Sequence, residues 1–349
     1  MTFLEKNQGK LTDYARMSQA LGARADYVQG GGGNTSVKLA DGRMAIKASG
    51  YCLKDVTPEA AYAVLQYGPI RDFYTGHALA QFEDAEKSGA AVTKENTCTV
   101  EGLASLRPSV EAGFHSVLGT FVAHTHSVYA NLLTCCTDCT ALAEQALADA
   151  DYTWGVVEYA DPGARLTFYI RDELARCTKR DGRAPSVILM KNHGVIVQGD
   201  TAEEVLRIHA DANRRFAAAF GLPEDAFQAP QLRQKGEGYV CTLDLGSVTP
   251  QALLTKPLYP DQLVFLGDTL QLSGENAAEG CFIIRPDGTL ELHMPEKKAR
   301  TLSETVAAVV FICNAMHARG LTPVTLDDAA QKFIDNWESE KYRKSLASK

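Results

Sequence analysis

The sequence predicts an α/β protein with a main domain built on a central sheet, followed by a smaller C-terminal α+β domain. Two observations lead to this class. Up to Pro223, strand-like apolar segments are interspersed with helix-like amphipathic ones, which is typical of a sheet covered by helices. Beyond Pro223 a connector rich in proline and glycine precedes one hairpin and two helical segments. We therefore place the main domain at 1–225 and the C-terminal domain at 235–349.

The elements of the main domain are predicted from the spacing of apolar residues and from the turn and capping residues that end each segment. Asp41-Gly42 between two apolar runs predicts a hairpin. Thr201 with Glu204 predicts a capping box at the start of the clearest helix, which Gly221 ends. The expected elements, in order, are a helix over 12–21, strands over 35–39 and 44–48, loops and short helices over 71–105, a strand over 121–126, a helix near 129–133, a strand over 187–190 and a helix over 201–220.

The C-terminal domain shows fewer clear signals. Residues 224–260 predict an irregular connector with one strand near 239–245, because prolines and glycines interrupt every longer pattern. Pro286-Asp287-Gly288 joins two apolar segments and predicts a hairpin. Helices are expected over 298–318 and 326–345, the second opened by Thr325 with Asp328 in the capping position.

Composition excludes several classes of function. The 349-residue chain has a formal net charge of −8 and a pI near 5.6, which argues against nucleic acid or an anionic membrane as a partner. No apolar run approaches 18 residues and the first residues lack a signal-peptide pattern, so neither a membrane span nor secretion is expected. The nine cysteines fit a reducing, cytoplasmic setting, and the Cys136–Cys139 pair is expected to pack rather than to react.

Three histidines are the most informative residues. On a strand, residues i and i+2 share one side, so His124 and His126 present both imidazoles to one point. His193 lies where the chain turns after the apolar strand 187–190. Three neutral imidazoles that converge form an open site for a divalent metal, zinc being the first choice. The alternative is that these are ordinary half-buried histidines.

Two segments have the composition of a phosphate site. Gly33-Asn34-Thr35-Ser36 and Lys47-Ala48-Ser49-Gly50 offer close backbone approach, exposed N–H groups and hydroxyl or amide donors. The glycine run is not a Walker loop, since no Gly-Lys-Ser/Thr closes it, and not a dinucleotide fingerprint, since a strand follows it. A flexible loop is the alternative interpretation.

Glu111 lies a short distance before the His124–His126 strand. A glutamate beside a divalent metal either ligates it or takes a proton that the metal has acidified. His115, four residues on, falls on the same helical face. It is either a fourth ligand, a support for Glu111 or a core histidine.

Five motifs in this order resemble the class II aldolase/adducin family: Gly-Asn-Thr-Ser, Ala-Ser-Gly, Pro-Ser-Val-Glu-x-x-x-His, His-Thr-His-Ser and Asn-His-Gly. The resemblance covers about 10–225. Within the family, this chain is most similar to the aldolase part of bifunctional rhamnulose-1-phosphate aldolase/alcohol dehydrogenases. The resemblance implies a three-layer α-β-α domain with a central sheet.

The resemblance also implies roles for individual residues. Glu111 would be the acid/base beside the metal, and Tyr159 would serve the aldehyde end from a neighbouring subunit of a homotetramer. Several relatives have a second serine where this chain has Val110, so one phosphate donor is missing, and Lys38 or Lys47 would replace it. The implied zinc ligands are His124, His126 and His193, and the implied phosphate-binding residues are Asn34, Ser49, Gly50 and Ser109.

The implied activity is that of a zinc-dependent aldolase, with another divalent metal as the alternative ion. It would cleave a ketose 1-phosphate, such as rhamnulose or fuculose 1-phosphate, to dihydroxyacetone phosphate and an aldehyde through a metal-bound enediolate. The alternative is a metal-dependent decarboxylase or 4-epimerase of a sugar acid or pentulose phosphate, although the epimerases usually carry Asp where Glu111 stands. A more distant alternative is a non-catalytic scaffold like adducin, which lacks the metal histidines.

Overall fold

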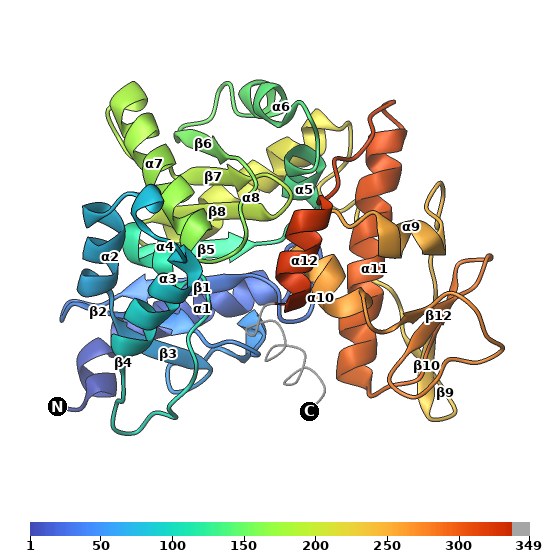
Figure 1. Ribbon diagram of the computed structural model, residues 1–349, viewed down its shortest axis with the longest axis horizontal. Helices are drawn as coiled ribbons and strands as arrows, with labels where there is room; N and C mark the ends of the chain where they lie inside the picture. Colours follow the sequence, from blue (N-terminus) through green and yellow to red (C-terminus); the bar gives the residue numbers. More distant parts are fainter. Residues whose placement is uncertain (337–349) are drawn as a thin grey trace.

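The computed structural model describes residues 1–336. Figure 1 shows a main domain of helices around a sheet, with a second, smaller sheet and its helices beside it. The predicted class, an α/β main domain followed by a further C-terminal domain, is confirmed.

The main domain is built on one eight-stranded sheet. All its neighbouring strands are antiparallel except the last pair, β7 and β6, which is parallel. In spatial order the strands are β4 (Thr97–Cys98), β3 (Tyr62–Gln66), β2 (Arg43–Lys47), β1 (Asn34–Lys38), β5 (Phe121–Thr125), β8 (Gly194–Gly199), β7 (Val187–Met190) and β6 (Trp154–Val157).

Helices cover both faces of this sheet. Along β5 the side chains of Phe121 and Ala123 pack into one layer and Val122 into the other, as the two-residue period of a strand requires. The first layer holds α1 (Phe3–Gly22), α5 (Val128–Thr134), α6 (Cys139–Ala146) and α8 (Ala202–Ala219); the second holds α2 (Tyr67–Gly76), α3 (Ala85–Glu95), α4 (Ala112–Val117) and α7 (Ala164–Asp181). Short 3-10 turns lie at Leu53–Asp55 and Leu79–Gln81.

One helix start and one helix cap differ from the sequence prediction. Helix α1 begins at Phe3, nine residues before the predicted start at 12, because Thr2 and Glu5 form a reciprocal capping box. Helix α8 begins after Thr201 as predicted, and the Thr201 hydroxyl accepts from the Glu204 N–H. The Glu204 carboxylate, however, accepts from the N–H of Asp200.

The C-terminal domain contains a five-stranded sheet. The predicted hairpin is confirmed: β12 and β13 pair antiparallel, and Gly288 turns between them with a positive φ of 80°. In spatial order the strands are β11 (Leu270–Gln271), β12 (Phe282–Ile284), β13 (Thr289–Leu292), β10 (Gly238–Thr242) and β9 (Arg233–Lys235).

Its helices are α9 (Pro250–Thr255), α10 (Pro260–Leu266), α11 (Glu296–His317) and α12 (Asp328–Asn336). The expectation of irregular structure over 224–260 was wrong at α9, which starts with a proline in its first turn. Proline suits that position because the first N–H groups of a helix have no partner within it. Asp327, not Thr325, caps α12, since its carboxylate accepts from the N–H of Ala330 at 2.8 Å. The rest of the helix predicted to 345 lies outside the described residues.

Helix α11 joins the two domains. It packs against α5 and α10, and the ring of Phe311 meets Tyr129 edge-on at 5.9 Å. One continuous apolar cluster therefore contains residues of both domains, and the boundaries at 225 and 235 stay a prediction. By length and composition α11 alone among the described helices would suffice to cross a membrane, and 61% of that apolar window is buried inside the protein.

Candidate metal centre

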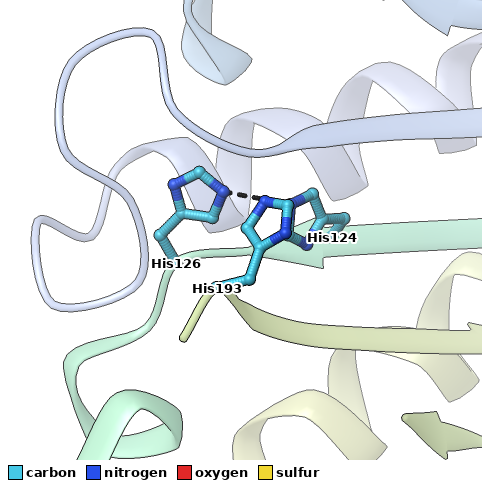
Figure 2. Close-up of side chains that lie close together, drawn as sticks. All are labelled: His124, His126 and His193. Atoms are coloured by element: carbon cyan, nitrogen blue, oxygen red, sulfur yellow. Dashed lines mark hydrogen bonds between the residues drawn. The ribbon is translucent and has the colours of Figure 1, made fainter. Parts of the chain in front are cut away.

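The end of β5 and the turn between β7 and β8 bring three histidines together. His124 is the fourth residue of β5, His126 follows the end of that strand, and His193 precedes β8. Their ligand nitrogens lie within 4.8 Å of one another, and all three side chains are buried. Figure 2 shows the rings of His126 and His193 converging on that of His124.

Partners on the far side of two of these rings fix where their protons sit. Nδ1 of His124 lies 3.2 Å from the carbonyl oxygen of Val195, and Nδ1 of His126 lies 2.5 Å from Oδ2 of Asp261. Both partner oxygens are placed to accept, which favours the tautomer with hydrogen on Nδ1 and a lone pair on Nε2 in each ring.

These two bare nitrogens face each other. Nε2 of His124 and Nε2 of His126 are 3.0 Å apart (Figure 2), which is a hydrogen bond when one of the two atoms carries a proton and a contact that needs a cation beside it when neither does. Two nitrogen ligands of one tetrahedral zinc ion would be roughly 3.3 Å apart, given Zn–N bonds of about 2.0–2.1 Å. Burial and the two neighbouring imidazoles also hold the pKa of His124 well below its usual range, which keeps its ring neutral. The donor set thus fits a divalent metal.

Glu111 lies against the same nitrogens. It precedes α4, is buried, and places Oε1 at 3.4 Å from Nε2 of His193 and 3.7 Å from Nε2 of His124. Its other oxygen, Oε2, accepts from the side-chain amide of Asn34. The carboxylate is therefore held at one oxygen and turned toward the histidines at the other.

A buried chain of hydrogen bonds supports Glu111. Asn34 stands opposite His124 in the β1–β5 register, and its carbonyl oxygen accepts from Nε2 of His115. Burial lowers the pKa of His115 to about 3, so the ring is neutral and its Nδ1 accepts from the Ser36 hydroxyl at 2.7 Å. Of the three roles considered for His115, the geometry matches support of Glu111 through Asn34.

A small cavity opens beside the histidines. The Asn34 amide also donates to the Ser109 hydroxyl at 3.2 Å. Lys47 reaches the cavity too, with Nζ donating to the carbonyl oxygens of Gly31 and Tyr51. The structure brings the sequence-predicted residues Asn34, Ser49, Gly50, Ser109, Glu111, His126 and His193 together around this one cavity.

Lys38 points elsewhere. Its ammonium group donates to the carbonyl oxygen of Leu118 and lies 4.7 Å from the centre of the Tyr67 ring. Burial, with the charge of Arg71 nearby, lowers its pKa to about 8. Of the two lysines considered as replacements for the missing phosphate donor, only Lys47 borders the cavity.

The family model for the class II aldolase and adducin N-terminal domain matches residues 12–218. The chain belongs to this family. Members of the family are generally metal-dependent enzymes, and the buried group of His124, His126 and His193 provides ligands for a metal here. No curated protein matched this chain.

Several solved structures are similar to part of this chain. An N-terminal class II aldolase domain from Thermoplasma acidophilum is 20% identical, with 59% of this chain and 91% of that one covered and a TM-score of 0.48. YgbL from Klebsiella pneumoniae, described as an aldolase/epimerase/decarboxylase, is 18% identical, with 62% of this chain and 90% of that one covered and a TM-score of 0.42. A sugar-phosphate aldolase from Thermotoga maritima is 14% identical over 61% and 94%, with a TM-score of 0.42.

Tyr159 lies apart from this cavity. It follows β6 and packs partly buried against the large apolar cluster. Burial and the nearby carboxylates of Asp161 and Asp327 raise the pKa of its hydroxyl. Pro162, three residues on, borders the cavity, whereas Tyr159 is not among the described residues that line it. Its role at the aldehyde end stays a prediction.

The sequence prediction missed Asp261. This residue of α10 is fully buried, borders the cavity and contacts His126. The signal available was the order Tyr-Pro-Asp, which places a proline and then an acid in the first turn of a helix. Nothing in that order links the acid to a histidine 135 residues earlier.

Proposed function

We propose that this chain is a cytoplasmic, zinc-dependent aldolase that cleaves a ketose 1-phosphate to dihydroxyacetone phosphate and an aldehyde. Rhamnulose and fuculose 1-phosphate are the first candidates, by resemblance to the aldolase part of the bifunctional rhamnulose-1-phosphate aldolase/alcohol dehydrogenases. The observation that carries the proposal is the convergence of the His124, His126 and His193 nitrogens, the first two 3.0 Å apart, with the Glu111 carboxylate beside them.

The metal would be held by His124, His126 and His193. When bound, it acts as a Lewis acid toward the carbonyl and hydroxyl oxygens of a substrate. The His124 ring contributes by being neutral and aligned before substrate arrives. His124 is held in this state by burial and by the carbonyl oxygen of Val195.

Glu111 is the group proposed to move the proton. Because Asn34 donates to Oε2, the Oε1 oxygen is directed toward the histidine nitrogens and toward any substrate oxygen bound beside them. The carboxylate would accept the proton of the C4 hydroxyl as the C3–C4 bond breaks and pass it to C3, so that the aldehyde and dihydroxyacetone phosphate are both formed. Such a group typically contributes about 10²–10⁴-fold to the rate.

The proposed phosphate site is the other end of the cavity. Ser49, Gly50 and Ser109 border it, and the buried ammonium group of Lys47 supplies positive charge there. A single lysine suits a phosphate as a point charge, so Lys47 would replace the donor lost at Val110. In the absence of substrate the Asn34 amide is engaged with Glu111 and Ser109, and its contact with phosphate stays a prediction.

A screen of ketose 1-phosphates with the zinc-loaded chain tests this function. Release of dihydroxyacetone phosphate from at least one substrate is expected, and Glu111→Gln should abolish most of it. Release of carbon dioxide from a sugar acid, or epimerisation without cleavage, would replace the aldolase by one of the alternatives on the same scaffold. A chain that binds no divalent metal and converts none of these substrates would favour the adducin-like scaffold.

We also propose, from the family resemblance, a homotetramer in which Tyr159 serves the aldehyde end of a neighbouring site. In a single chain Tyr159 does not line the cavity and its hydroxyl is buried, so this role requires the side chain to be repositioned on assembly. Light scattering at micromolar concentration is expected to give four subunits. An active monomer would exclude a shared site.

A further inference from the structure

The C-terminal domain contacts the metal centre through one carboxylate. Asp261 lies in the first turn of α10, directly after Pro260, and its side chain is completely buried. Its Oδ2 atom lies 2.5 Å from Nδ1 of His126, which is itself only 4% exposed. A contact this short between buried groups is in the range of a charge-assisted hydrogen bond.

The main domain leaves room for this carboxylate. Gly32, in the glycine loop before β1, has no side chain at the point where Asp261 enters. A Cβ atom there would fall 2.2 Å from Oδ2 of Asp261 and 3.1 Å from Nδ1 of His126. Any other residue at position 32 would therefore displace the carboxylate or the ring.

A second contact anchors the segment that carries Asp261. Asn192, next to His193, donates through its side-chain amide to the carbonyl oxygens of Leu258 and Val324, both at 2.9 Å. Leu258 is three residues before Asp261, so the start of α10 is tied to the turn that holds His193. Both loops that carry histidines thus contact the C-terminal domain.

The Asp261 carboxylate matters because the two nitrogens of a metal-binding imidazole have different roles. A histidine ligates a metal through one nitrogen only if that atom carries no hydrogen, and a partner on the other nitrogen selects this tautomer. Carboxylate partners of this kind also orient the ring and raise its basicity, and their loss typically lowers metal affinity about 10–100-fold.

We propose that Asp261 is a positioning residue of the metal centre. The C-terminal domain, which lies beyond the family match at 12–218, supplies in cis the acceptor that holds His126 with its proton on Nδ1 and Nε2 toward the metal. This inference rests on the metal site of the proposed function and is independent of which substrate is cleaved.

Metal affinity of Asp261→Asn tests the proposal. Asparagine keeps the size of the side chain but removes its charge, and its amide can present either a donor or an acceptor to Nδ1. Titration of the metal-free chain with Zn²⁺ against a chelating dye should give a dissociation constant about 10–100-fold higher than wild type. The control is Asp328→Asn, an exposed acid of the same domain, which should bind as wild type does.

Nuclear magnetic resonance of the metal-free wild type gives a second readout. With ¹⁵N-labelled histidine, the His126 ring should show its proton on Nδ1, and Asp261→Asn should shift the ring toward a mixture of tautomers. A wild-type His126 protonated on Nε2 overturns the proposal even if the variant fails to fold.

The outcomes separate this inference from the proposed function. A folded Asp261→Asn chain that binds Zn²⁺ as tightly as wild type overturns only the role of Asp261. A wild-type chain that binds no divalent metal overturns the proposed function and this inference together. Weaker metal binding in Asp261→Asn, whatever the substrate screen gives, supports the inference.

Discussion

The two carboxylates beside the histidines come from different domains and face different nitrogens. Glu111, from the main domain, lies 3.4 and 3.7 Å from the Nε2 atoms of His193 and His124 and is held by a neutral amide. Asp261, from the C-terminal domain, lies 2.5 Å from Nδ1 of His126, on the opposite side of the ring from the cluster. Because a ligand histidine binds metal through one nitrogen and donates a proton through the other, position alone separates the two acids. We expect Glu111 to govern turnover and Asp261 to govern metal retention.

The largest effect is expected when the ring next to Asp261 is removed. His126→Ala takes away one of three ligands, so both bound metal and turnover should be lost. Metal content by atomic spectroscopy and an aldolase assay measure the two losses. His317→Ala removes an exposed histidine at the end of α11 and should change neither. Full metal content in a folded His126→Ala chain would refute the assigned centre.

Glu111→Gln should separate the two acids most clearly. The amide cannot take a proton, so turnover should fall by roughly 10²–10⁴-fold while most of the metal is retained. Parallel measurement of kcat and of the Zn²⁺ dissociation constant should give the reverse pattern in Asp261→Asn. Glu101→Gln, at an exposed loop position, is the matched control. A rate within a few-fold of wild type would assign the proton transfer to another group.

His115→Phe tests the support behind Glu111. The substitution keeps a buried ring but leaves the Asn34 carbonyl oxygen and the Ser36 hydroxyl without this partner. Unsatisfied buried groups typically cost about 1–3 kcal/mol, so the free energy of unfolding in urea should fall by that amount. Turnover should also fall, with metal affinity unchanged. His77→Phe, at an exposed position, should show neither effect. Equal kinetics in His115→Phe and His77→Phe would argue against support of Glu111 by the His115–Asn34 hydrogen bonds.

The smallest expected effect concerns pH. His209 supports Thr125, which lies between His124 and His126, through a 2.7 Å contact of Nε2 with the hydroxyl, and burial lowers the pKa of His209 to about 3. A histidine in the unfolded chain has a pKa of about 6.5, so on acidification the unfolded chain binds this proton at a higher pH than the folded chain does. The contribution of His209 to stability is thus complete above that pH and declines on acidification toward 3.

The expected decline is roughly 1.4 kcal/mol per pH unit for each such histidine. Urea unfolding of the metal-free chain at several pH values between 7 and 4 measures it. His209→Gln should give a shallower dependence than wild type, since glutamine does not titrate. Identical slopes would mean that this histidine is not held neutral by the fold.

The main domain was the more predictable of the two. The His-x-His pair, the Gly-Asn-Thr-Ser loop and the turn at His193 are local patterns. The structure groups the three histidines and places Asn34, His126 and His193 around one cavity. Local spacing also suggested that His115 supports Glu111, since four residues on a helix lie on one face. Asn34 was predicted for phosphate from the resemblance, and no local pattern links it to Glu111, which lies 77 residues away in sequence.

The C-terminal contribution was missed for two physical reasons. The prolines at 250 and 260 were interpreted as interruptions, whereas each opens a helix in which its missing N–H costs nothing. The second reason is distance in sequence, because the pairing of Asp261 with His126 depends on how two domains pack. Periodicity describes one segment at a time and contains no information on such a contact.

Asn192 has a thermodynamic consequence of its own. Its backbone is left-handed, with φ at 52°, and its amide bridges two carbonyl oxygens of the C-terminal domain. Loosening that domain would release the loops of His193 and His126 together. By mass action, a metal that binds only the intact centre stabilises everything the centre requires. Zinc is therefore expected to raise the melting temperature of both domains as one cooperative transition, although all its ligands belong to the first.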